Sequence, residues 1–148
     1  MISISLPLKP RNWNTMSFAS TLYLYPILDL CCAKIPEELH AEIRLGLQEA
    51  LVNAAKHGNN LDPTKRIVVQ FSITKQEYSW VITDQGQGFI NNCDCKEKNK
   101  ELPPEESENG RGFCLIHEIF DQVHWNRQGN QLRLCKQLKN KKREPVIC

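Results

Sequence analysis

The chain has 148 residues, of which 41% are hydrophobic and 24% are charged, and its formal net charge is +2. This length predicts one domain with a core of its own, and so small a charge gives no support for direct nucleic-acid binding. No apolar run approaches the roughly 18 residues of a membrane span, and the first residues lack the pattern of a secretory signal, so we expect a cytoplasmic protein without membrane contact.

The first third of the chain predicts a lead-in, a strand and a helix. Residues 1–14 read as an extended lead-in. Residues 15–20, "TMSFAS", place Met16 and Phe18 on one side, which is typical of a short strand. Pro26 suits the first turn of a helix. This helix is expected to direct four side chains inward, namely Ile27, Leu28, Leu30 and Cys31.

The clearest predicted helix spans residues 36–57. Pro36 opens it, Lys56 and His57 lie in its last turn, and Gly58 supplies a C-terminal stop. Small and apolar side chains recur at helical spacing along one stripe, which we expect to face a sheet. They are Leu39, Ile43, Gly46, Leu47, Ala50, Leu51 and Ala54.

A hairpin and a long loop follow. Residues 66–74 and 77–84 alternate apolar and polar side chains, and Lys75 and Gln76 between them suit a turn. Residues 91–109 are polar, contain prolines and have few large apolar groups, so they predict a long loop.

The last part predicts a helix, a second hairpin and a tail. The hairpin turns at residues 128–130. The basic run at 139–148 reads as a solvated tail. Between the lead-in and this tail, we expect one domain that spans residues 15–138. Segregated helices and antiparallel strands predict an α+β fold, a two-layer sandwich with a mixed, mostly antiparallel sheet and helices on one face. The helix predicted after the long loop is expected to direct four side chains inward, namely Leu115, Ile116, Ile119 and Phe120.

The seven cysteines form no recognisable set. Their number is odd and no CxxC pair occurs, so they predict neither a disulfide framework nor a zinc site. Cys93 and Cys95 form a single CxC that could alternatively contact a metal. The pattern favours reduced thiols in a reducing compartment.

A polar stripe runs along the helix at 36–57. Glu49 and Asn53 are neighbours at spacing i, i+4, and Glu42 and Lys56 share their stripe. An Asn oxygen can bind Mg²⁺, which keeps water and phosphate as its other ligands, and a Glu one turn away can accept a proton. The same residues would also suit a solvated helix edge.

Two glycine-bearing stretches lie elsewhere in the chain. In "DQGQGF", Asp84 ends a strand and can accept a hydrogen bond from an exocyclic amine, while Gly86 and Gly88 permit a sharp turn; a tight loop after a hairpin strand is the alternative. "NGRGF" opens a helix, where backbone N–H groups suit a phosphate, although a plain helix cap would need the same glycines. No GKS or GKT follows, so the second stretch is not a P-loop.

"EALVNAAKHGN", "DQGQGF" and "NGRGFCLI", in this order and with a polar lid before the last, resemble the N, G1 and G2 boxes of the GHKL ATPase superfamily. The resemblance covers roughly residues 15–138 and implies the Bergerat nucleotide-binding fold. Within the superfamily the chain looks most like the small anti-sigma-factor serine kinases. The "KHGN" ending and the "PPEESENGRGFCLI" passage carry that likeness.

The resemblance implies a role for each matching residue. Glu49 would be the catalytic base, Asn53 the Mg²⁺ ligand, and Asp84 the acid that reads adenine. His57 would be structural, packing beside the helix end. Some members carry an arginine just before the lid glycines, where this chain has Glu108-Asn109. The remaining nucleotide-binding positions would be Gly86 and Gly88 at the base, Gly110 and Gly112 at the phosphates, and Lys56 and Arg111 as charge partners.

The resemblance also implies a function. The chain would be an ATP–Mg²⁺-dependent serine/threonine protein kinase that sequesters a sigma factor and phosphorylates an antagonist of the STAS type, and it would be a homodimer. An alternative is a non-catalytic ATP-sensing module that sequesters a partner. A third possibility, an ATP hydrolase, would use the same base on water.

Overall fold

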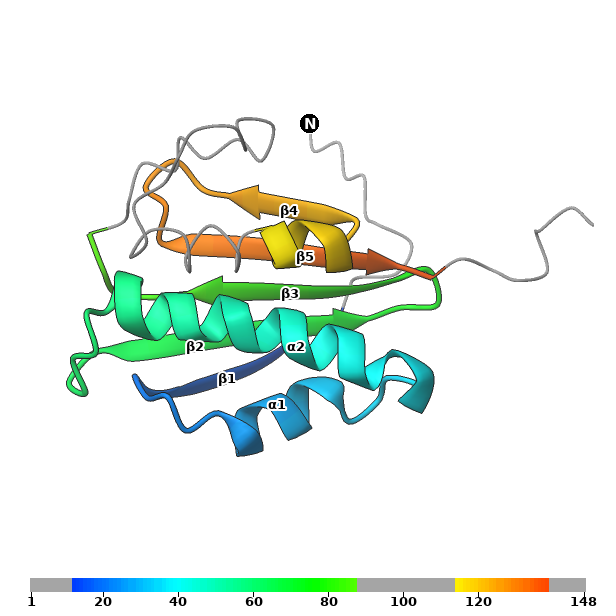
Figure 1. Ribbon diagram of the computed structural model, residues 1–148, viewed down its shortest axis with the longest axis horizontal. Helices are drawn as coiled ribbons and strands as arrows, with labels where there is room; N and C mark the ends of the chain where they lie inside the picture. The colour runs from blue at the N-terminus through cyan, green and yellow to red at the C-terminus, as the bar shows by residue number, and fades with distance from the viewer. Residues whose placement is uncertain (1–11, 88–113, 139–148) are drawn as a thin grey trace, which may run out of the picture.

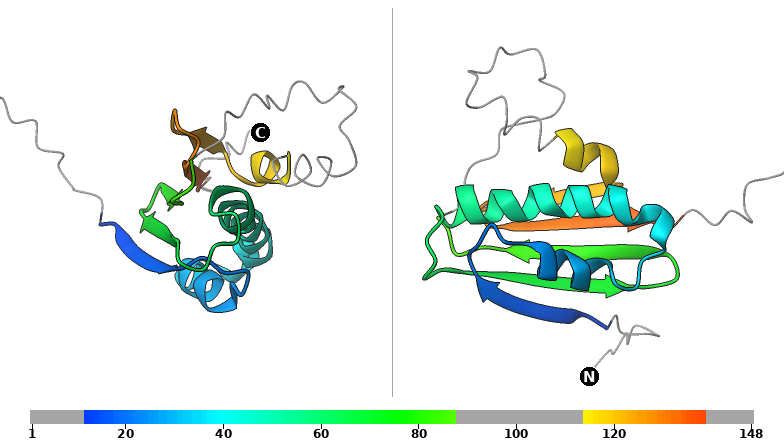
Figure 2. Two further views of the ribbon diagram at one scale, coloured as in Figure 1. Left: turned by 90° about the vertical axis from the view of Figure 1, so that its left-hand side faces the viewer. Right: turned by 60° about the horizontal axis from the view of Figure 1, so that its bottom comes forward.

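The computed structural model describes residues 12–87 and 114–138, which form a five-stranded sheet covered by helices. The strands lie in the order β1-β2-β3-β5-β4. Figures 1 and 2 show the sheet as one layer and the helices as a second layer on a single face. The elements are β1 (Asn14–Ala19), α1 (Tyr25–Cys32), α2 (Glu37–Asn53), the π-helical turn η1 (Ala54–Gly58), β2 (Arg66–Ile73), β3 (Glu77–Thr83), β4 (Gln122–Trp125) and β5 (Gln131–Gln137), and residues 114–119 are also helical. None of the helices in these two ranges has the length and apolar character needed to cross a bilayer.

The predicted α+β sandwich with helices on one face is confirmed, but the prediction of a mixed sheet is wrong for the described strands. All four neighbouring strand pairs are antiparallel. β3 and β4 run in the same direction, but β5 lies between them, so these two parallel strands do not hydrogen-bond to each other. The β2–β3 register pairs Phe71 with Trp80 and Val69 with Ile82, as the alternating pattern predicts.

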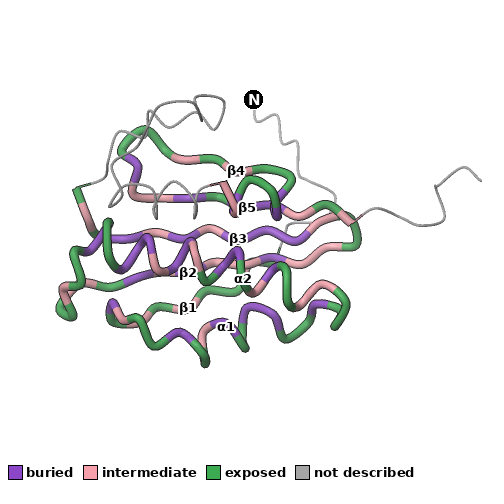
Figure 3. The backbone as a smooth tube through the Cα atoms, in the orientation of Figure 1, coloured by how far each residue is buried: buried purple, intermediate pink, exposed green. Residues whose placement is uncertain are grey.

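The core lies between α2 and the sheet, where Figure 3 shows the buried positions of the backbone. The predicted stripe of α2 is confirmed: its members are buried except Leu39, which is partly buried. One inward prediction is wrong, because Leu30 on α1 is 58% exposed. α1 buries Leu28, Cys31 and Cys32, and a residue two positions after Leu28 points to the opposite side of the helix.

The end of the long helix differs from the prediction. α2 continues beyond Asn53 as a π turn, in which the Asn59 N–H donates to the Ala54 carbonyl oxygen at 2.8 Å. Left-handed backbone falls on Asn60 (φ 53°) and Leu61 (φ 58°) rather than on Gly58. The helical run does end at Gly58, but this glycine is not a left-handed cap, so another contact must require it.

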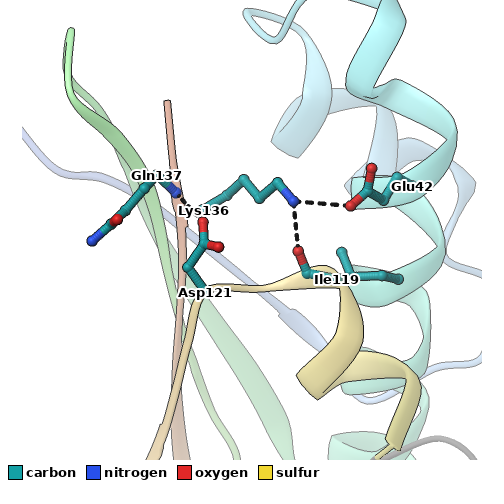
Figure 4. A network of polar contacts seen from close by, with 5 residues as sticks. All are labelled: Glu42, Ile119, Asp121, Lys136 and Gln137. Atoms are coloured by element: carbon teal, nitrogen blue, oxygen red, sulfur yellow. Dashed lines mark hydrogen bonds and ion pairs between the residues drawn. The ribbon is translucent and has the colours of Figure 1, made fainter. Parts of the chain in front are cut away.

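A lysine on β5 ties three elements together (Figure 4). Lys136 Nζ donates to Glu42 Oε1 on α2 at 2.9 Å and to the Ile119 carbonyl oxygen at 2.8 Å. Beside it, the Gln137 N–H donates to Asp121 Oδ2 at 2.6 Å. The cation therefore lies at the C-terminal end of the 114–119 helix, where it is favourable, and holds that helix against α2.

Gly46 is required by the contact between α2 and Phe120. A Cβ atom on Gly46 would lie 2.6 Å from Phe120 Cε2, and Phe120 is itself packed edge-on against Trp80 with ring centroids 5.6 Å apart. We expect Gly46→Ala to lower the free energy of unfolding, because overpacking costs about 1–3 kcal/mol and exceeds the gain of about 1 kcal/mol in helix propensity. Chemical denaturation measures this, with Ala41→Gly at an exposed position of α2 as the control for propensity alone. A more stable Gly46→Ala variant would contradict the close packing.

Candidate functional site

A small cavity between α2 and the sheet brings together two of the predicted site residues. Asn53, from the last residue of α2, and Asp84, which follows β3, both line it. The remaining lining residues are apolar, namely Ala50, Ala54, Ile82, Trp125 and Leu132. The two polar side chains thus meet at a small, mostly apolar cavity at the end of α2.

Asp84 is the buried carboxylate of this site. It is 6% exposed, and burial raises the pKa of its carboxyl, while the Gly86 N–H bond and the charge of Lys65 oppose that shift. The Gly86 N–H donates to Asp84 Oδ1 at 2.8 Å, and the Asp84 N–H donates to the Asn130 carbonyl oxygen at 2.9 Å. The carboxylate is therefore held in place and can accept a further hydrogen bond.

Two glycines make room for this carboxylate. A Cβ atom on Gly58 would fall on the Asp84 carboxyl group, and a Cβ atom on Gly86 would fall on the Gly58 carbonyl group. Neither glycine has a positive φ. The end of η1 and the loop after β3 thus need glycine for close approach, not for backbone conformation.

Asn53 carries an unsatisfied amide. The residue is 6% exposed, and its shielded Nδ2 has no hydrogen-bond partner among the described residues. A buried polar group without a partner costs about 1–3 kcal/mol, so a ligand that supplies the partner would stabilise it. Rotating the amide presents its oxygen instead of its nitrogen, and the side chain therefore fits either a phosphate oxygen or a cation.

The other residues of the predicted stripe have different surroundings. Glu49 lies one turn before Asn53, is partly buried, and makes no hydrogen bond or ion pair with another residue of the described ranges. Glu42 is engaged by Lys136. Lys56 and His57 are exposed on η1. Of the stripe, Asn53 therefore lines the cavity, Glu49 lies one turn before it on α2, and Glu42 has a structural ion pair.

Several predicted residues lie outside the described ranges, namely Gly88, Gly110, Arg111, Gly112, Cys93 and Cys95. The cysteines that are described, Cys31, Cys32, Cys114 and Cys135, are free thiols. Burial raises the pKa of the Cys31 thiol to about 12.

Lys65 and Trp125 were not predicted as site residues. Lys65 acts on the Asp84 charge from the segment before β2. The β2–β3 register, in which Val68 pairs with Thr83, brings the chain before Ile67 beside the chain after Thr83. That register could be read from the two alternating runs, whereas the position of Trp125 depends on the insertion of β5 between β3 and β4.

Comparison with known proteins agrees with the resemblance drawn from the motifs. The sequence profile described as "Histidine kinase-like ATPase domain" matches residues 28–136. An anti-sigma F factor of Clostridium perfringens (strain SM101 / Type A) is 31% identical over 87 residues, which cover 59% of this chain and 61% of that protein. The serine-protein kinase RsbW of Bacillus licheniformis is 28% identical over 90 residues, covering 55% of this chain and 54% of the relative.

A third relative, an anti-sigma F factor of Anoxybacillus flavithermus (strain DSM 21510 / WK1), is 24% identical over 107 residues, covering 72% of this chain and 73% of that protein. The chain matches about three fifths of the length of the Clostridium relative and about half of the kinase. The profile match spans most of the chain and confirms the family implied by the three boxes. The predicted boundaries at residues 15 and 138 stay predictions.

Proposed function

The chain belongs to the histidine kinase-like ATPase domain family, and from this premise we propose that it is an ATP- and Mg²⁺-dependent serine/threonine protein kinase that acts as an anti-sigma factor. The observation that carries the proposal is the shared cavity of Asn53 and Asp84, where an unsatisfied buried amide faces the same space as a buried carboxylate. Relatives named anti-sigma F factor and serine-protein kinase support the choice of activity.

Each described residue has a task in this proposal. The Asp84 carboxylate accepts a hydrogen bond from the exocyclic amine of adenine, and the close approach of Gly58 and Gly86 shapes the base pocket. The Asn53 amide contacts Mg²⁺, whose chemistry is to neutralise phosphate charge. Lys56 lies on the adjoining turn and adds positive charge beside the phosphates.

Glu49 acts on the acceptor. Its carboxylate takes the proton of a serine or threonine hydroxyl while the hydroxyl oxygen forms a bond to the γ-phosphorus and the bond to ADP breaks. Gly88, Gly110, Arg111 and Gly112 complete the nucleotide contacts in the proposal. A carboxylate that has no bonding partner among the described residues, one turn from the proposed metal ligand, favours transfer over a purely sensing role.

The partners are proposed from the relatives. Anti-sigma F factor is the name of several of them, so a sigma factor is the proposed sequestered protein and an antagonist of the STAS type the proposed phosphate acceptor, both in the cytoplasm. We propose a homodimer as the working form.

The first experiment measures binding and transfer separately. ATP affinity with and without Mg²⁺ is measured by calorimetry, and γ-labelled ATP is then incubated with the STAS-domain proteins of the source organism. Saturable ATP binding and label on a serine or threonine of one STAS protein are expected. Binding without transfer to any of them would favour the sensing module, and release of labelled phosphate alone would favour the hydrolase.

Asn53→Ala is expected to weaken ATP binding at least about tenfold in the presence of Mg²⁺, and much less in EDTA, because it removes the proposed metal contact. The substitution removes a buried amide whose nitrogen has no hydrogen-bond partner and leaves a small cavity in its place. The free energy of unfolding without nucleotide should therefore fall only by the cost of that cavity. Calorimetric titration in both buffers measures the effect. Gln48→Ala, at an exposed position of the same helix, is the control. Equal losses in Mg²⁺ and in EDTA would contradict the role of Asn53 as metal ligand.

A further inference from the structure

Asn59 joins three segments that meet beside the candidate site. Its Nδ2 donates to the Arg66 carbonyl oxygen at 3.1 Å, at the start of β2, and its Oδ1 accepts from the Gln85 N–H at 2.8 Å, after β3. The triangle closes on its third side, where the Arg66 N–H donates to Gln85 Oε1 at 2.6 Å. We call these three bonds the amide triangle. It links the end of η1, the start of β2 and the loop after β3.

The amide triangle is anchored from inside the protein. Asn59 is 0% exposed, and a fully buried amide whose two ends are both bonded is a rigid connector. Gln85, in contrast, is exposed, so its side-chain bond competes with water. Most of the positioning must therefore come from Asn59.

The backbone that follows Asn59 adopts an uncommon conformation, which is held by hydrogen bonds. Leu61 adopts a left-handed conformation, which a branched apolar residue seldom does. Its N–H donates to the Ala55 carbonyl oxygen at 2.8 Å, and the Asp62 N–H donates to the Asn59 carbonyl oxygen at 3.0 Å. A strained conformation persists only where its surroundings hold it, and such places are enriched at functional sites.

The neighbours of the triangle are the groups that form the base pocket. Gly58 immediately precedes Asn59, and Asp84 and Gly86 flank Gln85. These are the same three residues whose backbones and carboxyl group come into close contact. The bond from Gln85 to Asn59 therefore sets how the Asp84 carboxylate lies against Gly58.

We propose that Asn59 is a positioning residue that fixes the Asp84 carboxylate and thereby sets the preference of the site for adenine over guanine. The inference rests on the proposed function, because it assumes that Asp84 reads the base. Adenine presents an amine at the position where guanine presents a carbonyl oxygen, so a fixed carboxylate accepts from the first and repels the second. A carboxylate that can shift discriminates less.

The test uses Asn59→Ala and Gln85→Ala, with Thr74→Ala as the matched control. Thr74 Oγ1 accepts from the Glu77 N–H at 3.0 Å in the β2–β3 turn, at the opposite end of those strands, so its loss also removes a turn contact but far from the pocket. Dissociation constants for ATP and GTP are measured together with Tm. For Asn59→Ala the ratio of the GTP to the ATP constant should fall about tenfold, the effect of one well-placed hydrogen bond. Gln85→Ala should show a smaller fall and the control none.

A lower Tm with an unchanged nucleotide ratio in Asn59→Ala would overturn the proposal, because it would make Asn59 merely structural. If that variant does not fold, the Gln85→Ala ratio decides: an unchanged ratio overturns the proposal. A second readout needs no nucleotide. Amide hydrogen exchange at Gln85 and Gly86 should be slow in the wild-type protein and at least about tenfold faster in Asn59→Ala. If the wild-type protein binds neither nucleotide, the proposed function fails by itself, and unchanged exchange at Gln85 would separately overturn the positioning role.

Discussion

Glu49→Gln is expected to lower phosphoryl transfer by about 10²- to 10⁴-fold, the usual contribution of a general base, while leaving ATP binding nearly unchanged. Glutamine keeps the shape of the side chain but cannot take a proton from the acceptor hydroxyl. Glu49 lies one turn from Asn53 on α2 and is partly buried there. Single-turnover transfer from labelled ATP measures the first effect and calorimetry the second, so loss of chemistry is separated from loss of binding.

Glu42→Gln is the matched control for this experiment. Glu42 lies on the same polar stripe of α2, but its carboxylate is 2.9 Å from Lys136 Nζ and is 44% exposed. An ion pair this exposed contributes about 0–1 kcal/mol, so the control should change stability slightly and transfer not at all. Full transfer activity in Glu49→Gln would contradict its assignment as the base, whereas equal losses in both variants would indicate a general effect on α2.

The regular elements could be predicted because their signals are local. Every third or fourth residue of α2 is small or apolar, and the alternating runs of β2 and β3 carry their own register, as the pairing of Phe71 with Trp80 shows. Leu30 was misassigned because α1 has only eight residues, too few for its apolar positions to define one face. The order of β5 and β4 could not be read, since nothing in either strand specifies which of them pairs with β3.

The sequence predicts individual residues of the candidate site but not their arrangement. Asn53 and Asp84 were chosen for the chemistry of their side chains, and the structure brings both to one cavity. The helical run ends at Gly58 as predicted, but the physical reason is not the left-handed cap that usually places a glycine after a helix, because here the carboxyl group of Asp84 occupies the space of its Cβ. Asn59 was missed since a buried amide has no periodic signal: its burial follows from contacts with Arg66 and Gln85, which are distant in the sequence.

Asp84→Asn is expected to weaken ATP binding by about 10- to 100-fold, the effect of losing a hydrogen bond to a charged acceptor, and to stabilise the protein without nucleotide at neutral pH. Burial raises the pKa of the Asp84 carboxyl above its ordinary value of 3.8, so the folded protein holds the proton more tightly than the unfolded chain. Its contribution to stability is therefore present below the ordinary pKa and is lost as pH rises through the pKa of the folded state. Asparagine removes this loss and keeps an oxygen for the Gly86 N–H.

Thermal unfolding between pH 4 and pH 8 measures the stability effect, and each kcal/mol gained should raise Tm by about 2–4 °C. Asp62→Asn is the control, because its hydrogen bonds from Thr64 lower the pKa of the Asp62 carboxyl and give the opposite sign. Stability from Asp62 is present above its ordinary pKa and lost as pH falls, so this variant should be no more stable than the wild-type protein at neutral pH.

An Asp84→Asn variant that binds ATP as tightly as the wild-type protein does would contradict the role of Asp84 in base recognition. A variant that melts at a lower temperature at pH 7 would contradict a net cost of burying the Asp84 charge. The two readouts should move in opposite directions, because a carboxylate held ready for a ligand lacks that ligand's hydrogen bond in the free protein.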